Sequence, residues 1–363
     1  MTDALGDATA GEPSVFPRGC TRLAFVSRVA VEENIRALRR ASLRAGVLID
    51  LSSEAWGHGL LDAARAVSSS GSATFAVSDM ADGIALRGAG VDGEIVVWDL
   101  PVTASQGELS AFGLSAAASS PEAVGVAVRA GAQSVWLDLG IKRVTGPSEH
   151  PELEAFARAL SAAGQGSVTL CASDARLLHN AASVLTAEGT EVRGLVSPAG
   201  GDVAPVGGYA GLVRIGAEAF GLSEALTPAP ASVRPALSLR APIIALKNVD
   251  ADVGVSYGYT YRTSEQTTLA LVPIGYGDGV DRSLGNRAQV LLRGQRLTIA
   301  GRVAMDATVL DVGAGGAEVG DVVEFFGDPA GGAPSAQDYA ELLGISSAAV
   351  VAGLTARVMR RWK

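Results

Sequence analysis

Apolar and polar positions alternate in a regular way along the first two thirds of the chain. From Leu23 to about Gly216, short apolar runs are separated by amphipathic stretches. In the first stretch Val31, Ile35 and Leu38 recur at the spacing of one helix face, which predicts a helix packed on a sheet. Eight runs have the length and composition of buried strands: "VLIDL" (47–51), "TFAV" (74–77), "EIVVW" (94–98), "SAAA" (115–118), "SVWLD" (134–138), "VTLCA" (168–172), "VRGLV" (192–196) and "GLVRI" (211–215).

The repeated order of strand and helix predicts an α/β fold. Near-continuous apolar strands are typical of a parallel sheet that is covered on both faces. Closing eight such strands gives a (β/α)₈ barrel of the TIM type, and this is the architecture that we expect. A doubly wound open sheet is the structural alternative.

The pattern changes after the segment "LTPAPASVRPALSLRAP". Pro228, Pro230 and Pro235 indicate a linker, and strand-like stretches dominate after it until "SAQDYAELLG". We therefore expect a disordered tail over residues 1–19, a barrel domain over 20–235 and a mainly antiparallel β domain over 236–363.

Composition excludes several kinds of partner. With 363 residues, of which 48% are hydrophobic and 18% charged, the chain can form two domains with buried cores. The net charge is −9 and the basic residues are scattered, so no surface for nucleic acid is indicated. No apolar run approaches the roughly 18 residues of a membrane span. Cys20 and Cys171 give neither a disulfide framework nor a metal pattern. Since the first 19 residues lack a signal-peptide pattern, we expect a cytoplasmic protein without nucleic-acid, membrane or metal partners.

Several polar residues stand where a barrel would carry a site. Ser52, Arg143, Ser197 and Arg214 come at or just after the ends of predicted strands, which meet at the functional face of a barrel. Gly216 follows Arg214 closely, and a glycine there lets backbone N–H groups approach an anion. In the second domain aromatic and acidic residues lie in or near glycine-rich turns, a pattern that turn structure alone also explains: Tyr257, Tyr276, Asp278, Met305 and Asp306.

The order of these motifs is more specific than any one of them. "AWGHG", "LDLGIKR", "VRIGAEAFG", "VSYGYTYRTSEQTTLALVPIGYGDGVDR" and "GRVAMD" follow one another along the chain. In this order the sequence resembles the alanine racemase family from about Leu23 to Trp362. The resemblance implies a barrel that holds pyridoxal phosphate, a C-terminal β domain and a head-to-tail dimer whose active sites are shared between subunits.

The resemblance also implies roles for single residues. Arg214 matches an arginine that hydrogen-bonds the pyridine nitrogen of the cofactor, Gly216 and Ser197 match phosphate contacts, and Arg143 matches an arginine near the phenolic oxygen. "LVSPAGG", which contains the serine, departs from the Asn-Ser pattern of the family. Tyr257 matches a catalytic base that the partner subunit donates, and three further residues match substrate and channel contacts from the same partner: Tyr276, Met305 and Asp306.

At the position of the Schiff-base lysine the chain carries Ser52, seven residues before the last glycine of "WGHG". A hydroxyl group forms no imine with an aldehyde and is a poor base at pH 7. His58 of the same motif resembles a structural hydrogen-bonding residue near the phosphate loop, with a ligand or base as the alternative. Four more positions depart from the family pattern: Trp56 for a tyrosine, Trp136 for a lysine, Leu170 near a histidine position and Ala348 for a tyrosine that reaches the phosphate.

The chain contains three lysines, Lys142, Lys247 and Lys363, although it has 29 basic residues. Lys142 lies on the expected face of the barrel, but adjacent side chains diverge and its neighbour Arg143 already points toward the site in the family pattern. Lys247 and Lys363 fall in the predicted β domain and at the end of the chain.

Two classes of function remain. The departures predict a non-catalytic alanine racemase homologue, a ligand-binding or regulatory partner in which pyridoxal phosphate is bound non-covalently or not at all. The alternative is a pyridoxal-phosphate-dependent racemase that interconverts L- and D-alanine. The partners that we expect are a small molecule near Arg214 and Gly216 and a second copy of the chain, or a lysine-bearing alanine racemase in its place.

Overall fold

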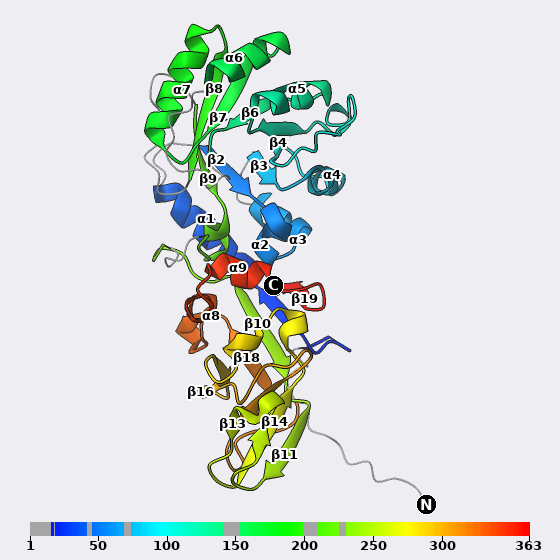
Figure 1. The fold of residues 1–363 in the computed structure, drawn as a ribbon, viewed down its shortest axis with the longest axis vertical. Coiled ribbons are helices and arrows are strands. Elements are labelled where there is room, and N and C mark those ends of the chain that lie inside the picture. Colours follow the sequence, from blue (N-terminus) through cyan, green and yellow to red (C-terminus); the bar gives the residue numbers. More distant parts are fainter. Residues whose placement is uncertain are drawn as a thin grey trace, which may run out of the picture. The chain divides into compact units, whose positions relative to one another are not determined.

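The computed structural model describes residues 16–17, 19–41, 46–68, 74–140, 153–198, 210–224 and 230–363. Within these residues the chain forms an eight-stranded closed barrel and a set of smaller, mostly antiparallel sheets (Figure 1). The predicted barrel and antiparallel β domain are therefore confirmed, and the open-sheet alternative is wrong.

All eight predicted barrel strands are present in the predicted order, and each neighbouring pair runs parallel. The barrel closes where the first strand pairs with the last, with Leu48 opposite Arg214. The strands are β2 (Gly46–Asp50), β3 (Thr74–Val77), β4 (Glu94–Val97), β5 (Ser115–Ala118), β6 (Val135–Asp138), β7 (Ser167–Cys171), β8 (Glu191–Pro198) and β9 (Ala210–Ile215).

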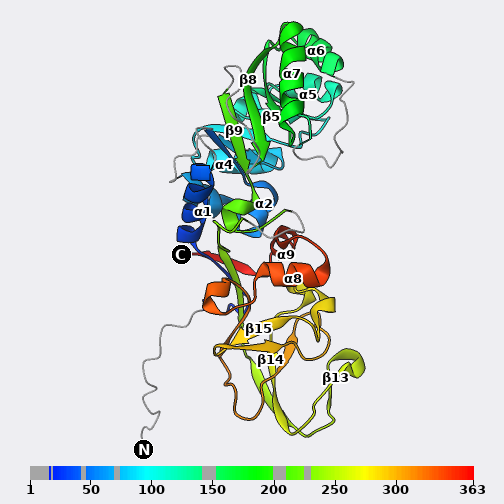
Figure 2. The same cartoon turned by 90° about the vertical axis from the view of Figure 1, so that its left-hand side faces the viewer.

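Helices cover the outside of the barrel (Figure 2). The predicted first helix is present, and it buries Val31, Ile35 and Leu38 on one face. Short polar side chains start several of the others, as when Ser120 accepts the N–H of Ala123. The helices are α1 (Arg28–Ala41), α2 (Ser52–Gly57), α3 (Leu60–Ser68), α4 (Met80–Gly88), α5 (Pro121–Arg129), α6 (Leu153–Ala162) and α7 (Ala175–Ala187).

Large side chains fill the inside of the barrel. Trp98 and Trp136 lie in one buried cluster with Leu48, Val96 and smaller residues from neighbouring strands. The indole N–H of Trp136 donates to Glu94 over 3.0 Å. A tryptophan therefore occupies, with its polar atom satisfied, the position where the family resemblance places a lysine.

The β domain contains three small sheets. The largest has the order β16 (Gln295–Thr298), β15 (Gln289–Leu292), β18 (Val322–Phe326), β10 (Leu237–Pro242), β1 (Leu23–Val26) and β19 (Met359–Trp362). A second contains β11 (Ala245–Val249), β14 (Thr267–Val272) and β17 (Thr308–Asp311), and a third contains β12 (Gly254–Val255) and β13 (Tyr261–Arg262). The segment from Leu23 thus begins in this domain and enters the barrel only with α1.

The chain divides into two compact units. We call residues up to 25 together with 239–326 and 355–361 the β unit, and residues 26–238, 327–354 and 362–363 the barrel unit. Two C-terminal helices, α8 (Ala336–Leu343) and α9 (Ser347–Ala352), therefore belong to the barrel unit. Among the described residues no helix is long and apolar enough to cross a membrane. The cytoplasmic location stays a prediction.

Candidate active site

Ser52 begins α2 directly after strand β2, as the sequence predicted. Its side chain is buried, and its hydroxyl donates a hydrogen bond of 2.5 Å to the Oδ1 atom of Asp50. The backbone N–H of Ser52 donates to the same oxygen over 3.0 Å. Because Asp50 is fully buried, the two hydrogen bonds from Ser52 help to satisfy a buried carboxylate at this end of the barrel.

The backbone after Ser52 forms a left-handed turn. Ser53, Glu54, Ala55 and Trp56 have φ angles of 53°, 57°, 52° and 56°. Left-handed backbone costs about 1–2 kcal/mol for each non-glycine residue, so other contacts must hold this turn. The indole N–H of Trp56 donates to the carbonyl oxygen of Asp50 over 3.0 Å, which is one of those contacts.

Arg214 lies at the end of β9 and is almost completely buried. Its Nε and Nη2 atoms reach Oδ2 of Asp50 over 2.8 and 2.7 Å, and Nη1 reaches Glu224 over 3.1 Å. Burial alone would lower the pKa of Arg214, but the charges of Asp50 and Glu224 outweigh burial and raise it above its ordinary value. The Arg214 guanidinium also lies 5.9 Å from the ring centre of Trp56.

Gly216 follows Arg214 at the start of a short 3₁₀ helix (Ala217–Phe220). Its N–H donates to the Oε2 atom of Glu218 over 3.1 Å. A Cβ atom at Gly216 would lie 2.6 Å from Oε1 of Glu224, so this carboxylate occupies the space beside the glycine. Burial raises the pKa of Glu218, and the charge of Glu224 acts in the same direction.

Ser197 and His58 are both buried. The Ser197 hydroxyl donates to the carbonyl oxygen of Pro198 over 3.4 Å, on the strand beside Arg214. The imidazole of His58 stacks on Phe220 with 4.2 Å between ring centres. Its Nδ1 atom lies 3.0 Å from the carbonyl oxygens of Ala55 and Trp56, a position that favours the structural interpretation.

Ala348 lies in α9, within the barrel unit. Its N–H donates to the carbonyl oxygen of Ser223 over 3.0 Å, and the Ser347 hydroxyl accepts the N–H of Ser223 over 2.9 Å. The same helix packs tightly against α2, because a Cβ at Gly57 would lie 2.5 Å from the carbonyl oxygen of Val351. Ala348 provides no phenol group, so none of the phosphate contacts of a tyrosine are available from this position.

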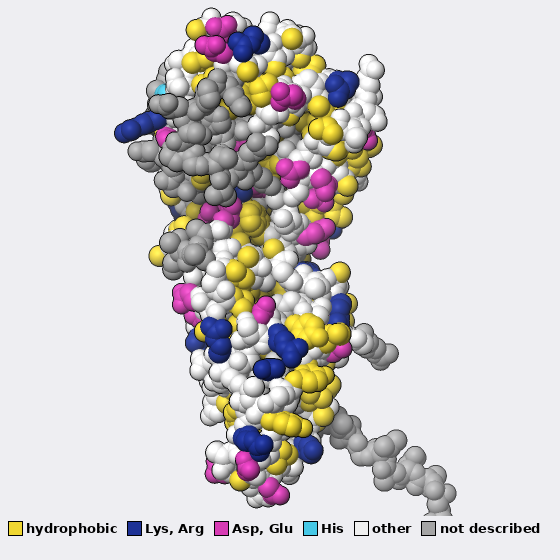
Figure 3. Space-filling model, in the orientation of Figure 1, with side chains coloured by type: hydrophobic (Ala, Val, Ile, Leu, Met, Phe, Trp, Pro, Cys, Tyr) yellow, Lys and Arg dark blue, Asp and Glu magenta, His cyan; other side chains and the backbone are white. Residues whose placement is uncertain are grey.

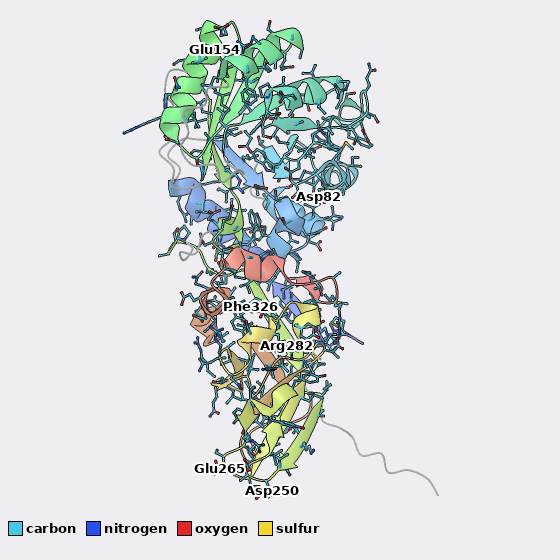
Figure 4. All side chains as sticks on the ribbon, viewed as in Figure 1. Asp82, Glu154, Asp250, Glu265, Arg282 and Phe326 are labelled. Atoms are coloured by element: carbon cyan, nitrogen blue, oxygen red, sulfur yellow. The ribbon has the colours of Figure 1, made fainter. Side chains whose placement is uncertain are left out.

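In the β unit, four of the predicted site residues expose their side chains: Tyr257, Tyr276, Met305 and Asp306. The guanidinium of Arg282, labelled in Figure 4, lies 5.8 Å from the ring centre of Tyr257. Arg282 also lines an open pocket of about 460 Å³ together with Asn286 and Arg302. In the turn that contains Tyr276, Asp278 is buried and accepts the N–H of Gly275.

Further arginines hold the loops of this face in place. Arg22 and Arg357 contact Asp278 over 2.9 and 3.1 Å, and Arg357 also pairs with Asp306 over 2.5 Å. Figure 3 shows Lys and Arg side chains beside hydrophobic ones on the β unit. Ion pairs of Arg357 therefore link the turn that contains Tyr276 to Asp306.

The structure brings Ser52, Trp56, His58, Arg214 and Gly216 together in the barrel unit. Arg143 and Lys142 lie outside the described residues. The roles that the resemblance gave to all of these residues stay predictions. Sequence reasoning missed Asp50, Glu218 and Glu224, and the only available signals were an aspartate that ends an apolar strand and two glutamates soon after an Arg-x-Gly triplet.

The chain is thus a two-domain protein, with a (β/α)₈ barrel followed by a mainly antiparallel β domain, and it buries Arg214 at the end of the last barrel strand. The chain belongs to the alanine racemase family. Residues 26–173 match the alanine racemase N-terminal domain, and residues 236–362 match the alanine racemase C-terminal domain.

Individual relatives match over nearly the whole chain. Alanine racemases of Thermobifida fusca and Beutenbergia cavernae are 33% and 34% identical, and the matches cover 91% and 93% of this chain and 95% and 96% of those proteins. The crystal structure of alanine racemase from D-cycloserine producing Streptomyces lavendulae superposes with a TM-score of 0.84 at 29% identity, covering 95% of this chain and 97% of that one. Alanine racemase from Streptomyces coelicolor A3(2) gives 0.83 at 27% identity, covering 94% and 98%.

Proposed function

We propose that this chain is a non-catalytic member of the alanine racemase family that acts through binding. The observation that carries the proposal is Ser52, a buried hydroxyl bonded to Asp50 at the position of the Schiff-base lysine. The family depends on pyridoxal phosphate, whose chemistry requires an amine that condenses with its aldehyde. A serine provides neither that amine nor an effective base at neutral pH.

The residues around Ser52 do not fit pyridoxal phosphate either. Arg214 is engaged by two carboxylates, and the N–H of Gly216 already donates to Glu218. Trp136 and Ala348 replace a lysine and a tyrosine that the family pattern places at the cofactor. We therefore derive no catalytic step through the cofactor in this chain.

The racemase alternative rests on the comparisons, which favour it more than the non-catalytic interpretation. The relatives reported above are named alanine racemase and match over nearly their whole length at 33–34% identity. Under this alternative an amine from elsewhere must replace the missing one. Lys142 is the candidate, because Lys247 lies in β11 of the β unit and Lys363 directly follows β19 rather than a barrel strand.

One experiment separates the two functions. The full chain is incubated with pyridoxal phosphate, its absorbance is recorded, and the sample is reduced with borohydride and digested for peptide mass analysis. We expect no aldimine band and no labelled lysine, and turnover of L-alanine at least about 10⁴-fold below a lysine-bearing relative assayed in parallel. An aldimine band with a label on Lys142, and with D-alanine formed, establishes the racemase instead.

We further propose that the partner is another chain of this family, either a second copy or a lysine-bearing alanine racemase. Support comes from the exposed set of Tyr257, Tyr276, Met305 and Asp306, which the chain retains although its own cofactor residues differ. Charge supports it as well. The whole net charge of −9 resides in the barrel unit, whereas acidic and basic residues balance in the β unit, so the two units of different copies repel each other less than two barrel units would.

The partner proposal is tested by co-expression with a lysine-bearing alanine racemase of the host, followed by tagged pull-down, sizing and racemase assays. We expect co-purification, and a change in racemase activity that Tyr257→Phe reduces. Tyr259→Phe is the matched control, because this residue is equally exposed in the same turn. A monomeric chain that leaves racemase activity untouched contradicts the proposal.

A further inference from the structure

Three carboxylates and one guanidinium lie together at the ends of β2 and β9. We call Asp50, Arg214, Gly216, Glu218 and Glu224 the Gly216 cup. In this cup Glu218 accepts the N–H of Gly216, Glu224 accepts from Nη1 of Arg214, and Asp50 accepts from Nε of Arg214. Backbone N–H groups and guanidinium groups are donors with which proteins often bind anions.

Side-chain atoms also occupy the space beside Gly216. A single Cβ atom at Gly216 would lie 2.6 Å from Glu224 Oε1, 3.2 Å from Arg214 Nη2 and 3.2 Å from the Trp56 ring. While Glu224 keeps this position, its carboxylate occupies the side of Gly216 that a Cβ atom would enter.

We propose that Glu218 and Glu224 fill the place of an anionic ligand, so that the barrel site excludes phosphate groups whether or not residue 52 is a lysine. This inference rests on the proposed function only in placing the ligand site at this end of the barrel. It assigns the exclusion of phosphate groups to Glu218 and Glu224. The absence of a lysine at position 52 does not explain that exclusion.

The electrostatic balance supports the exclusion. Among the residues that the structure describes at this place, the positive charge of Arg214 faces two carboxylates, and a third, Glu218, accepts the neighbouring N–H. A phosphate would bring further negative charge against this excess in a partly buried setting, where screening by water is weak. It would also have to displace charge-assisted hydrogen bonds that already exist.

The test compares charge and volume at the two glutamates. Isosteric variants, Glu218→Gln with Glu224→Gln, remove the charges and keep the volume, whereas Glu218→Ala with Glu224→Ala removes both. Glu188→Gln is the control, because Glu188 is an exposed glutamate at the end of α7. Binding of inorganic phosphate, pyridoxal phosphate and pyridoxal to the full-length chain is measured by calorimetry and by ³¹P nuclear magnetic resonance.

We expect no saturable phosphate binding by the natural chain or by Glu188→Gln. The alanine pair should bind inorganic phosphate and pyridoxal phosphate at least about tenfold more tightly, with a smaller gain for the glutamine pair and none for pyridoxal. Circular dichroism establishes folding, and the glutamine pair serves if the alanine pair does not fold.

Two results overturn the inference: phosphate binding by the natural chain within twofold of the variants, or folded variants that gain no affinity. Either result can occur in a chain that forms no aldimine and racemizes nothing. The failure of this inference is therefore distinct from the failure of the proposed function, which turnover by the natural chain would show.

Discussion

Breaking the ion pair between Asp50 and Arg214 should destabilise the barrel unit strongly. In Asp50→Asn the buried guanidinium loses a carboxylate that approaches it at 2.7 and 2.8 Å, while both side chains stay buried. Removing one partner of a buried pair costs about 3–5 kcal/mol, because the remaining charge keeps its desolvation penalty. Glu224 stays beside Arg214, so we expect the lower end of that range, about 3 kcal/mol.

The effect is measured by urea unfolding, followed by circular dichroism, and by the thermal midpoint. For a unit of this size about 3 kcal/mol corresponds to a fall of about 6–12 °C. Glu154→Gln is the matched control. Glu154, labelled in Figure 4, forms an exposed i,i+4 ion pair with Arg158 at 3.7 Å. Removing its charge should change the free energy of unfolding by less than about 0.5 kcal/mol.

A double variant tests whether the loss arises from the charge left behind. Asp50→Leu with Arg214→Met removes both charges, so the double variant should be less destabilised than the sum of the two single changes. The reasoning is refuted if Asp50→Asn lowers the free energy of unfolding by less than about 1 kcal/mol. It is also refuted if the loss in the double variant equals the sum of the losses in the two single variants, because Asp50 then does not stabilise the buried charge of Arg214.

Three further predictions concern single positions. Ser52→Lys alone should form no detectable D-alanine from L-alanine in a chromatographic assay, and efficient turnover would show that the rest of the pocket is intact. Burial, with nearby carboxylates, raises the pKa of Asp82 from 3.8 to about 6. The folded state thus holds this proton more tightly, and the stability that it contributes is complete below about pH 4 and lost as the pH rises through about 6. In pH-dependent unfolding Asp82→Asn should flatten this fall, which is at most about 1 kcal/mol after solvent screening; an unchanged slope contradicts the assignment. Gly57→Ala should cost about 2–4 kcal/mol in urea unfolding, because its φ is 83° and its Cβ would strike the Val351 carbonyl, whereas Gly164→Ala, with φ of 71° and open space, should cost about 1 kcal/mol. Equal costs for the two glycines would refute the clash.

Local patterns were sufficient for the barrel but not for every strand. All eight barrel strands were predicted because each is an apolar run between helices, and the run itself carries the signal. Leu23–Val26 has the same local character, yet it pairs with β10 and β19 in the β-domain sheet. Its partners begin more than 200 residues away, and no local pattern encodes a pairing at that distance.

The site was predicted in position but not in its bonding. Strand ends correctly placed Ser52 and Arg214 in one region, because parallel strands of a barrel end at the same face. Nothing in the sequence shows that Asp50 points inward and is fully buried, since aspartate usually ends a strand in solvent. The left-handed backbone over 53–56 was also missed, because none of those residues is a glycine.

The contacts of Asp50 determine what a lysine at position 52 would meet. The oxygen that accepts the Ser52 hydroxyl belongs to the carboxylate that neutralises Arg214. A lysine introduced at this position would place an ammonium group in reach of the same carboxylate, and an adjacent negative charge favours the protonated form of an amine. Such an amine is a poor nucleophile toward an aldehyde, because only the neutral form attacks. Restoring the missing lysine therefore restores the atom without its reactivity. Asp50 is therefore an obstacle to aldimine chemistry at this position, separate from the two glutamates beside Gly216.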